Sequence, residues 1–354
     1  MPSYKDKNNG KWFCKFYYTN WNGEKKQKKK SSFKLKKEAD QWERTFLEKY
    51  KAQPHITIET MWGHYLESIQ GDKKILTLRN KKTVYNSKIK PWFKNLYVDE
   101  ITPFQIKKWQ LWLQKQNISN STINAYKMIL SSLFTFAVKY FGLSKNPCSA
   151  VSNLKVIKKE MDYWTLEEFN EYMNNVQTND TLKLMVYILF WTGMRIGELL
   201  ALQIKDINFK DNTITISKNA VYMSSENIII QDTTKNYIKR DINIHNALKK
   251  RLNKHIDGLY GAKEDTLLFP MSNYHYVKRH FRNSFKKVNV KKIRIHDLRH
   301  SHISLLINLG YPINGIARRV GDTPETIIST YAHIYKKTTL EFINKLETLD
   351  TNRM

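Results

Sequence analysis

Residues 182–199, LKLMVYILFWTGMRIGEL, carry the strongest structural signal in this chain. The stretch Leu182–Trp191 is apolar almost throughout, which is typical of a helix buried inside a domain. Thr192-Gly193 breaks that helix, and the pattern predicts a second helix that begins near Arg195. Glu198 follows one turn later, and apolar residues flank the pair. We therefore expect a half-buried arginine that is held by the Glu198 carboxylate.

The residues that follow this stretch predict one mixed domain, in which a few strands accompany helices. Alternation of apolar and polar residues predicts strands at Ile204–Phe209, Thr213–Ser217 and Ile238–Ile244. Lys235 lies in the connection before the last of these strands. From Ile295 onward the pattern is helical to the end of the chain.

The pentapeptide HDLRH places His296, Arg299 and His300 on one helical face, because they are spaced i, i+3 and i+4. Two histidines at this spacing can bind zinc, but the glutamate of a His-Glu-x-x-His site is missing and Arg299 would repel a dication. We therefore expect no metal here. A structural pair of core histidines is a second interpretation. A third is an anion site, in which Arg299 forms a bidentate fork and His296 donates or accepts a proton.

Tyr331 lies in STYAH, residues 329–333, and follows Arg299 by 32 positions. The chain has 20 tyrosines, so only its context makes this one notable. That context is an ordered set of motifs: TGMRIGEL at 192–199, then Lys235, then HDLRH, then YAH at 331–333. In order and in spacing this set resembles the tyrosine recombinase, or phage integrase, family. The resemblance covers essentially the whole chain.

The family's catalytic positions can be carried over residue by residue. They are occupied here by Arg195, Lys235, His296, Arg299 and Tyr331. Glu198 and His300 are expected to support them. The resemblance implies that the tyrosine attacks a DNA phosphate, which leaves a 3′-phosphotyrosyl link and a free 5′-hydroxyl. Because bond energy is conserved in that link, rejoining is expected to need neither a cofactor nor a metal.

Physical chemistry explains why these residue types suit such a reaction. Two guanidiniums, Arg195 and Arg299, can hold the non-bridging oxygens of a pentacoordinate phosphorane with fixed positive charge. Tyrosine is a weak nucleophile, because with a pKa of about 10 only roughly one in 10³ is ionised at pH 7. His296 is the candidate proton acceptor or phosphate donor. The leaving 5′-alkoxide needs a general acid, and the resemblance assigns Lys235 to that role.

One position departs from the family pattern. The family usually has a histidine or tryptophan nine residues before the nucleophile, whereas this chain has Asp322. An ionised carboxylate cannot donate a hydrogen bond to a phosphate and would repel it. Asp322 therefore either turns away to orient His296 or the two arginines, or stays protonated in a site of low dielectric constant. Our hypothesis is that Asp322 has a structural or supporting role.

Two further features lie beyond Tyr331. Tyr335 is a rival nucleophile on the same helical face, although the spacing from Arg299 favours Tyr331. The C-terminal tail carries an apolar stripe, which consists of Leu340, Ile343, Leu346 and Leu349. This stripe either packs on its own domain or, as the resemblance implies, docks on a neighbouring protomer of a tetramer on DNA.

The charge of the chain points to a polyanion as its partner. Its 354 residues include 60 Lys and Arg against 32 Asp and Glu, a net charge of +28. Residues 1–52 hold 15 basic and 6 acidic side chains, residues 53–158 hold 16 and 5, and residues 159–354 hold 29 and 21. An excess spread over all three segments suits basic modules that bind one long nucleic acid.

Other classes of protein are disfavoured by the same sequence. The longest apolar run, Leu184–Trp191, is far short of the ~20 residues that span a bilayer, so we expect no membrane association. No signal peptide is visible at residues 1–15. Two cysteines, Cys14 and Cys148, cannot form a disulfide framework. We expect a cytoplasmic, nucleoid-associated protein of a bacterium or other host cell.

Residues 1–52 predict a small sheet that packs on one helix. Strands are expected at Tyr4–Lys7, Lys11–Thr19 and Lys25–Phe33, and a helix is expected at Lys36–Tyr50. The third strand carries a basic run, which consists of Lys25, Lys26, Lys28, Lys29 and Lys30. This run either blocks edge-to-edge strand pairing or binds DNA phosphates in a groove. The segment is similar to the arm-site DNA-binding module of integrases.

Residues 53–150 predict four helices and are similar to the core-binding domain of the same family. The helices are expected at Ile58–Ile69, at Thr77–Ile89 with a stop near Pro91, after the Thr102 cap as far as Gln116, and from Asn120 to just before Gly142. Their net charge suits a clamp on duplex DNA, although a scaffold with a solvated lysine face is the alternative. Residues 151–162 are expected to be a linker, and residues 163–354 the catalytic domain with its tail.

The predicted fold is thus multidomain α+β, with a three-stranded sheet plus helix, a four-helix domain and a mainly helical catalytic domain. The resemblance implies a site-specific recombinase that integrates and excises a mobile element. Its expected partners are double-stranded arm-site and core-site DNA, a homotetramer on that DNA, an excisionase and a host DNA-bending protein. A non-catalytic DNA-binding regulator and a type IB topoisomerase are the alternatives that these residues leave open.

Overall fold

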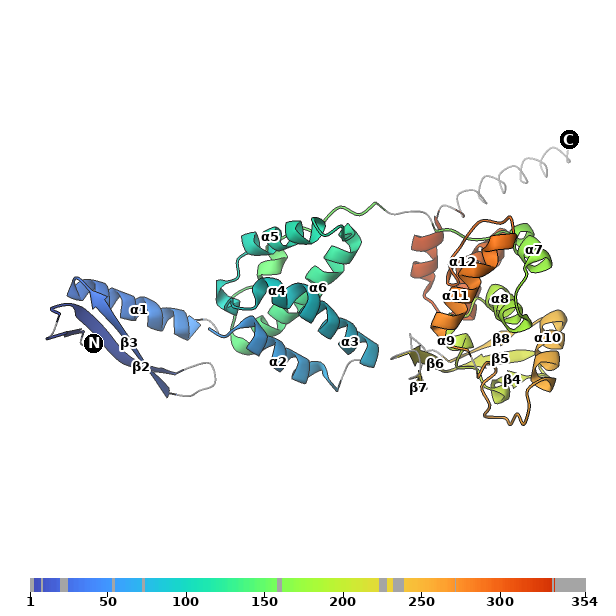
Figure 1. Cartoon of the computed structure of the whole chain (residues 1–354), viewed down its shortest axis with the longest axis horizontal. Helices are drawn as coiled ribbons and strands as arrows, with labels where there is room; N and C mark the ends of the chain where they lie inside the picture. Colours follow the sequence, from blue (N-terminus) through green and yellow to red (C-terminus); the bar gives the residue numbers. More distant parts are fainter. Residues whose placement is uncertain are drawn as a thin grey trace, which may run out of the picture. The chain divides into compact units, whose positions relative to one another are not determined.

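The computed structural model describes residues 3–7, 9–19, 25–52, 55–71, 74–157, 161–222, 228–231, 239–270, 272–332 and 334 of the chain (Figure 1). The chain divides into two compact units, Met1–Lys158 and Lys159–Met354. Within the described residues, no helix is long and apolar enough to cross a membrane. Helices dominate and small sheets accompany them, so the predicted multidomain α+β fold class is confirmed.

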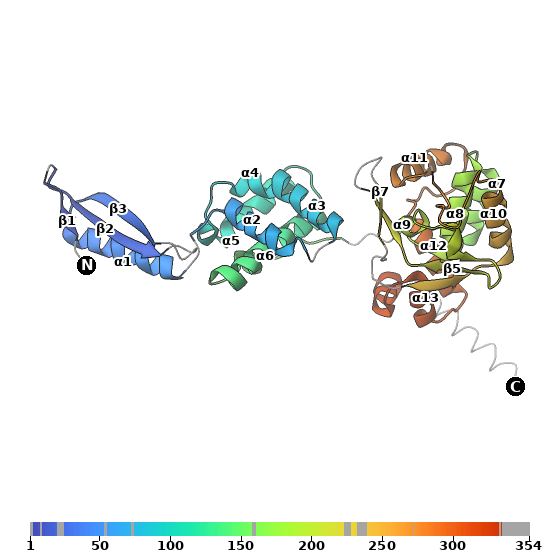
Figure 2. The ribbon, with the colours of Figure 1, turned by 90° about the horizontal axis from the view of Figure 1, so that it is seen from below.

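The N-terminal part is a three-stranded antiparallel sheet with one helix along it. The strands β1 (Tyr4–Lys5), β2 (Trp12–Thr19) and β3 (Lys25–Phe33) lie in sequence order, and α1 (Lys36–Ala52) packs on β2 and β3 (Figure 2). Cys14 and Phe16 are buried with Ala39, because alternate residues of β2 face the helix. The lysines of β3 are exposed to solvent.

The next part is helical. It contains α2 (Ile58–Ile69), α3 (Ile75–Val84), α4 (Lys90–Phe93), α5 (Pro103–Gln114) and α6 (Asn120–Phe141). Their ends follow local chemistry: Thr102 forms a capping box with Gln105, and α6 ends at Gly142, whose φ of 72° is left-handed. The core of this part is rich in aromatic side chains, and Trp109 is fully buried.

The predicted stop near Pro91 is wrong. A π-helical turn, Tyr85–Ile89, connects α3 directly to α4, and the helix continues to Phe93. Pro91 lies in the first turn of α4, directly after this π-helical turn. The wider turn before it accommodates the proline ring, so the helix is not ended.

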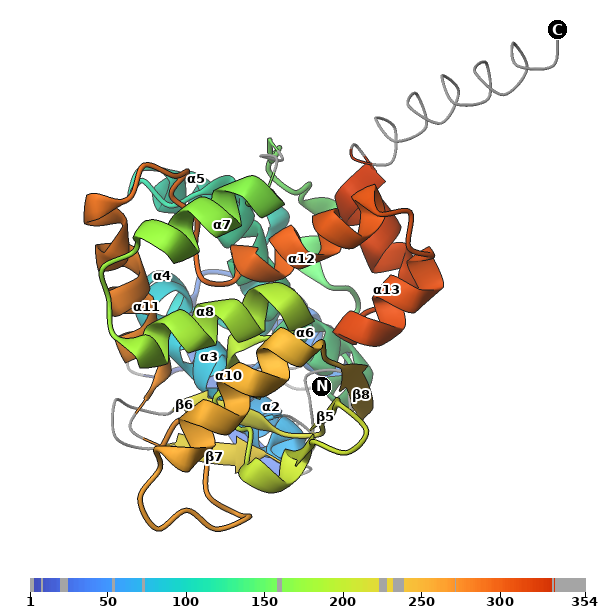
Figure 3. The same cartoon turned by 90° about the vertical axis from the view of Figure 1, so that its right-hand side faces the viewer.

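The second unit packs helices and short strands around an apolar core. Its helices are α7 (Leu166–Asn175), α8 (Asp180–Thr192), α9 (Ile196–Leu199), α10 (Asn246–Asp257), α11 (Tyr274–Ser284), α12 (Asp297–Asn308) and α13 (Ile313–Val320), and residues 324–332 are also helical. The buried helix α8 contacts α10, α11 and α12 (Figure 3). This helix is the apolar stretch that dominates the sequence, and it lies at the centre of the unit.

The strands of this unit form two small sheets. One is antiparallel in the order β4 (Ile207–Asn208), β5 (Thr213–Ile216) and β8 (Arg240–Asn243). The other pairs β6 (Asn219–Tyr222) with β7 (Ile228–Gln231), a pairing that was not predicted from the sequence. Two strands of only four residues each contain too little alternation to stand out.

The predicted strand Ile204–Phe209 is largely wrong. A 3₁₀ turn, Ile204–Asp206, takes its first half and only Ile207–Asn208 pairs as a strand. The Asp206 carboxylate accepts a hydrogen bond from the backbone N–H of Gln203 at 2.9 Å, and Lys218 binds the same carboxylate. This local capping competes with strand pairing.

Candidate active site

Arg195 is placed by the break between α8 and α9. Gly193 ends α8 with a φ of 64°, and Arg195 then caps the short helix α9. The Arg195 backbone N–H donates to Glu198 Oε2 at 2.9 Å, and its guanidinium donates to Glu198 Oε1 at 3.2 Å. The Glu198 side chain is fully buried, whereas Arg195 keeps 14% of its side chain exposed. The expected pairing of these two residues is therefore present.

Glu198 binds a second arginine that sequence reasoning missed. Arg240, on β8, donates to Glu198 Oε2 at 2.6 Å and to Oε1 at 3.2 Å, and its Nε donates to the carbonyl of Arg319 at 2.9 Å. Burial alone would raise the pKa of the Glu198 carboxyl, but Arg240 and then Arg195 lower it overall. A signal existed in the sequence: Arg240 is in phase with the buried Ile242 of the same strand.

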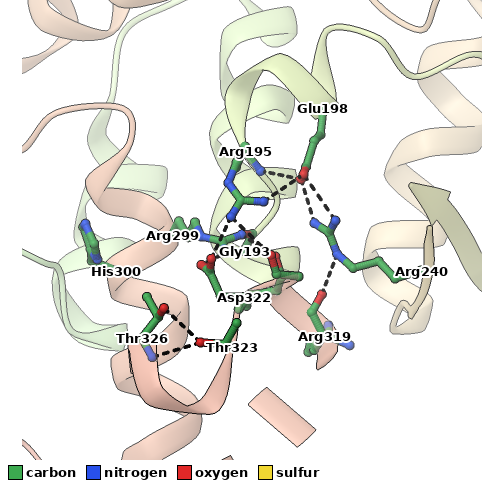
Figure 4. A network of polar contacts seen from close by, with 12 residues as sticks. Gly193, Arg195, Glu198, Arg240, Arg299, His300, Arg319, Asp322, Thr323 and Thr326 are labelled. Carbon is green, nitrogen blue, oxygen red and sulfur yellow. Dashed lines mark hydrogen bonds and ion pairs between the residues drawn. The ribbon is translucent and has the colours of Figure 1, made fainter. Parts of the chain in front are cut away.

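Asp322 lies between the two arginines that the family resemblance singles out. Arg195 Nη2 donates to Asp322 Oδ1 at 2.9 Å, and Arg299 Nη2 donates to Oδ2 (Figure 4). Arg299 is also fixed by the carbonyls of Gly193 at 2.8 Å and Val320 at 2.6 Å. Of the two alternatives left open for Asp322, the contacts fit the one in which it orients the arginine pair.

These contacts form a continuous charged row. Arg240, Glu198, Arg195, Asp322 and Arg299 alternate in sign, and their formal charges leave a net +1. Burial, followed by the charge of Arg195, lowers the pKa of the Arg299 guanidinium, and Asp322 opposes that shift. The two guanidiniums that converge on the Asp322 carboxylate present N–H donors of the kind that also bind phosphate groups.

Tyr331 approaches this row from the helix at residues 324–332. Its side chain is 3% exposed, and its hydroxyl is hydrogen-bonded to Nδ1 of His300. Burial raises the pKa of the Tyr331 hydroxyl, while Arg299 opposes that effect and Asp322 adds to it. The hydrogen bond to His300 connects the tyrosine to the residue that follows Arg299 in α12.

The histidines of HDLRH take different positions. His296 directly precedes α12 and is exposed, whereas His300 lies in the first turn of the helix. Their rings meet edge to face with centroids 5.3 Å apart, and the His300 and Tyr331 ring centroids are 5.7 Å apart. Burial, followed by His296, lowers the pKa of His300 to about 4.

The remaining predicted residues lie apart from this cluster or outside the described part of the chain. Lys235, Tyr335 and the tail stripe from Leu340 onward are among the residues that the structure does not describe. The lysines of β3 belong to the other unit. Within the described ranges, no group of three or more His, Cys, Asp or Glu side chains is arranged to hold a metal ion.

Three family descriptions match successive parts of the chain. "Phage integrase family" matches residues 160–338, "Arm DNA-binding domain" matches residues 2–50, and "Phage integrase, N-terminal SAM-like domain" matches residues 57–113. The last two fall on the sheet-plus-helix part and on the first half of the helical part.

Individual proteins resemble the chain over most of its length. The ICEBs1 integrase of Bacillus subtilis (strain 168) is 29% identical over 316 residues, which cover 85% of this chain and 86% of that protein. The integrase of Staphylococcus phage L54a is 29% identical over 315 residues, which cover 78% of this chain and 88% of that protein. Because these alignments cover more than three quarters of each protein, the similarity is not confined to one domain.

Solved structures share the fold. The Tn1549 transposon integrase in complex with transposon right end DNA has a TM-score of 0.70 at 19% identity. The match covers 82% of this chain and 100% of the Tn1549 chain. A lambda integrase tetramer bound to a Holliday junction has a TM-score of 0.63 at 17% identity. This match covers 92% of this chain and 94% of the lambda integrase chain. At these identities the likeness concerns the fold alone.

Proposed function

The chain belongs to the phage integrase family of site-specific tyrosine recombinases, and on that premise we propose that it integrates and excises a mobile DNA element. The proposed reaction is attack of Tyr331 on a DNA phosphate, with a 3′-phosphotyrosyl intermediate and strand exchange. The observation that supports it most strongly is the convergence of Arg195 and Arg299 on one anion, together with the hydrogen bond between Tyr331 and His300, the residue after Arg299.

The geometry suits this chemistry. A scissile phosphate in the place of the Asp322 carboxylate would meet two guanidiniums that Glu198 and backbone carbonyls already hold. Charge placed in advance stabilises a phosphorane without reorganisation during the reaction. His296, which is exposed, can approach a DNA phosphate from solvent as a hydrogen-bond donor. Lys235 is the proposed acid for the 5′-oxygen.

DNA is the proposed partner of all three parts of the chain. The two solved structures compared above are DNA complexes, and one of them is a tetramer on a Holliday junction. We assign arm-site DNA to residues 1–52, core-site DNA to residues 53–150 and the scissile phosphate to residues 163–354. The exposed lysines of β3 would contribute salt-sensitive, sequence-independent affinity.

Other partners and the location of the protein follow from the same proposal. A homotetramer would carry out strand exchange, and an excisionase and a host DNA-bending protein would set its direction. The proposed substrate places the protein in the cytoplasm with the nucleoid.

The proposed function can be tested with DNA that carries the joined ends of the element. A short direct repeat flanking the gene would locate the core site, and a nick placed beside it traps the covalent complex. The full-length chain should attach to the 3′-phosphate of this DNA and leave a scrambled site uncut. Tyr331→Phe should remove the covalent product and retain DNA binding.

Two outcomes would overturn the proposal. Relaxation of any supercoiled plasmid, with no preference for the core site, would indicate a topoisomerase. Tight binding to the core site with no covalent product from the wild-type chain would indicate a non-catalytic regulator.

A further inference from the structure

The hydroxyl of Tyr331 is hydrogen-bonded to His300, one residue beyond the HxxR motif that the family resemblance assigns. Arg299 and His300 are neighbours in the first turn of α12. Arg299 reaches toward Asp322, whereas Nδ1 of His300 reaches the tyrosine hydroxyl. Consecutive residues of one helical turn thus contact the Asp322 carboxylate and the nucleophile.

Two carboxylates that could be considered as proton acceptors, those of Asp297 and Asp322, are already hydrogen-bonded to arginines. Asp297 receives hydrogen bonds from the Arg294 side chain, at 2.7 Å and 3.0 Å, and one from the Arg294 backbone N–H. Asp322 binds both Arg195 and Arg299. Both carboxylates thus accept hydrogen bonds from guanidiniums, whereas the Tyr331 hydroxyl is hydrogen-bonded to His300.

The imidazole of His300 has the properties of a proton acceptor. Burial, then His296, and then Arg299 and Arg294, lower its pKa to about 4, and Asp297 opposes them. The imidazole is therefore neutral at pH 7 and can accept a hydrogen bond at Nδ1. A phosphate bound to Arg299 would offset one of these positive charges, so proton uptake by His300 would become easier once DNA is in place.

We propose that His300 is the general base that takes the proton of Tyr331 during DNA cleavage, an inference that rests on the proposed recombinase function. In this step the Tyr331 O–H bond breaks and its proton passes to His300 Nδ1. The Tyr331 oxygen forms a bond to phosphorus as the bond from phosphorus to the 5′-oxygen breaks. The 5′-oxygen takes a proton from the general acid, for which Lys235 is the candidate. Rejoining reverses each transfer.

His296 then has a different task from the one that its motif suggested. Its ring packs edge-on against His300 and reaches solvent, where the DNA would lie. This position suits a side chain that donates a hydrogen bond to a DNA phosphate and holds the His300 ring in place. The role of general base is thus assigned to His300, the second histidine of HDLRH, and not to His296, which lies one helical turn before it.

The test uses single-turnover cleavage of the nicked core-site DNA by the full-length chain at pH 7. His300→Asn is the informative variant, because its amide oxygen can still accept the tyrosine hydrogen bond but cannot take up the proton. Its cleavage should fall by about 10²- to 10⁴-fold, the range typical of a lost general base. His275→Ala changes an exposed histidine of α11 and should cleave at the wild-type rate.

A second measurement separates a base from a packing residue. His300→Ala should regain cleavage when free imidazole is added, and its rate should rise about tenfold per pH unit above pH 7 as Tyr331 ionises. A 5′-bridging phosphorothiolate substrate, whose sulfur leaves without an acid, should rescue Lys235→Ala but not His300→Asn.

The outcomes distinguish the two claims. If the wild-type chain forms no covalent complex, the proposed function fails. If the wild type cleaves and His300→Asn cleaves within about threefold of it, a loss far below that expected for a general base, or if imidazole and high pH give His300→Ala no recovery, His300 is not the base. A larger defect in His296→Asn that imidazole rescues would assign the base to His296 instead.

Discussion

Asp322 gives the site an internal anion at a position where the family usually has a hydrogen-bond donor. Its single negative charge lies between two guanidiniums that would otherwise repel each other. With 20% of its side chain exposed, it is the most accessible acidic group of the row. Displacement by a phosphate would exchange one anion for another and leave the arginines in place.

Asp322→Asn should therefore weaken cleavage without abolishing it. The amide keeps the shape and one acceptor, but it loses the charge that aligns Arg195 with Arg299. We expect the single-turnover rate to fall by about tenfold, which corresponds to about 1.4 kcal/mol, the order of magnitude of one hydrogen bond. A loss as complete as that of Tyr331→Phe would show that Asp322 takes part in the reaction itself.

Arg240 should matter for stability more than any other arginine of the row. Among the described residues, its removal leaves the fully buried Glu198 carboxylate with Arg195 as its remaining cationic partner. Loss of one partner of a buried ion pair costs about 3–5 kcal/mol, so Arg240→Met should lower the free energy of unfolding by that amount. Arg251→Met is the matched control, since Arg251 is exposed and stacks on Tyr187 at 4.5 Å, and it should cost under about 1 kcal/mol. Equal losses in urea unfolding would refute this role for Arg240.

At this scale the sequence predicts local contacts better than distant ones. Arg195 and Glu198 are one turn apart, so their pairing follows from helical spacing alone. Arg240 lies 42 positions from Glu198, and Asp322 lies 127 positions from Arg195. Which distant charges meet depends on how α8, β8 and α13 pack, and no local pattern contains that information.

Among the elements, the break between α8 and α9 does most to build the site. Gly193 adopts a left-handed φ of 64°, and its carbonyl accepts a hydrogen bond from Arg299. A Cβ atom at Gly193 would lie 2.5 Å from Cδ2 of His302. The backbone at this turn therefore approaches α12 more closely than any side chain would permit.

Gly193→Ala should damage both the fold and the active site. A left-handed alanine costs about 1–2 kcal/mol, and the clash with His302 adds to that cost. Gly310→Ala is the matched control, because Gly310 has a φ of 73° but nothing within 4 Å of its Cβ position. Thermal unfolding should show a clearly larger loss for Gly193→Ala than for Gly310→Ala. Equal losses of stability in the two variants would mean that the close approach of Gly193 to His302 does not contribute to the cost.

The elements themselves were largely predictable where their ends carry chemical signals. The helix α2 has its predicted bounds, and a local signal of the same kind, the capping box of Thr165 with Glu168, starts α7. Predictions failed where a tertiary or turn-level effect competes with the pattern. The π turn before Pro91 and the 3₁₀ turn at Ile204–Asp206 are examples, and the short pair β6–β7 carried no readable alternation.

For the second compact unit, Lys159–Met354, a buried histidine links stability to pH. His302 is 2% exposed, its Nε2 accepts a hydrogen bond from Arg319 at 3.1 Å, and burial lowers its pKa from 6.5 to about 3. Between these two values the unfolded chain binds a proton that the folded chain does not. The free energy of unfolding should therefore decrease as the pH falls below 6.5, by up to about 1.4 kcal/mol per pH unit from this residue.

His302→Gln should flatten that dependence, because an amide oxygen can accept the Arg319 hydrogen bond and does not titrate. Urea unfolding at pH 7 and pH 5 should show a decrease about 2 kcal/mol smaller for the variant than for the wild type. An NMR titration in which His302 of the folded protein has a pKa near 6.5 would contradict the prediction.

The central claim is that this chain cleaves DNA with Tyr331, and identifying the covalent residue tests it most directly. The nicked core-site complex is trapped and digested with trypsin. Cleavage after Arg319 and Lys336 places Tyr331 and Tyr335 in one peptide, VGDTPETIISTYAHIYK, so fragmentation within that peptide must locate the nucleotide adduct. We expect the adduct on Tyr331. An adduct on Tyr335, or on a peptide outside residues 320–336, would contradict the assignment of Tyr331 as the nucleophile.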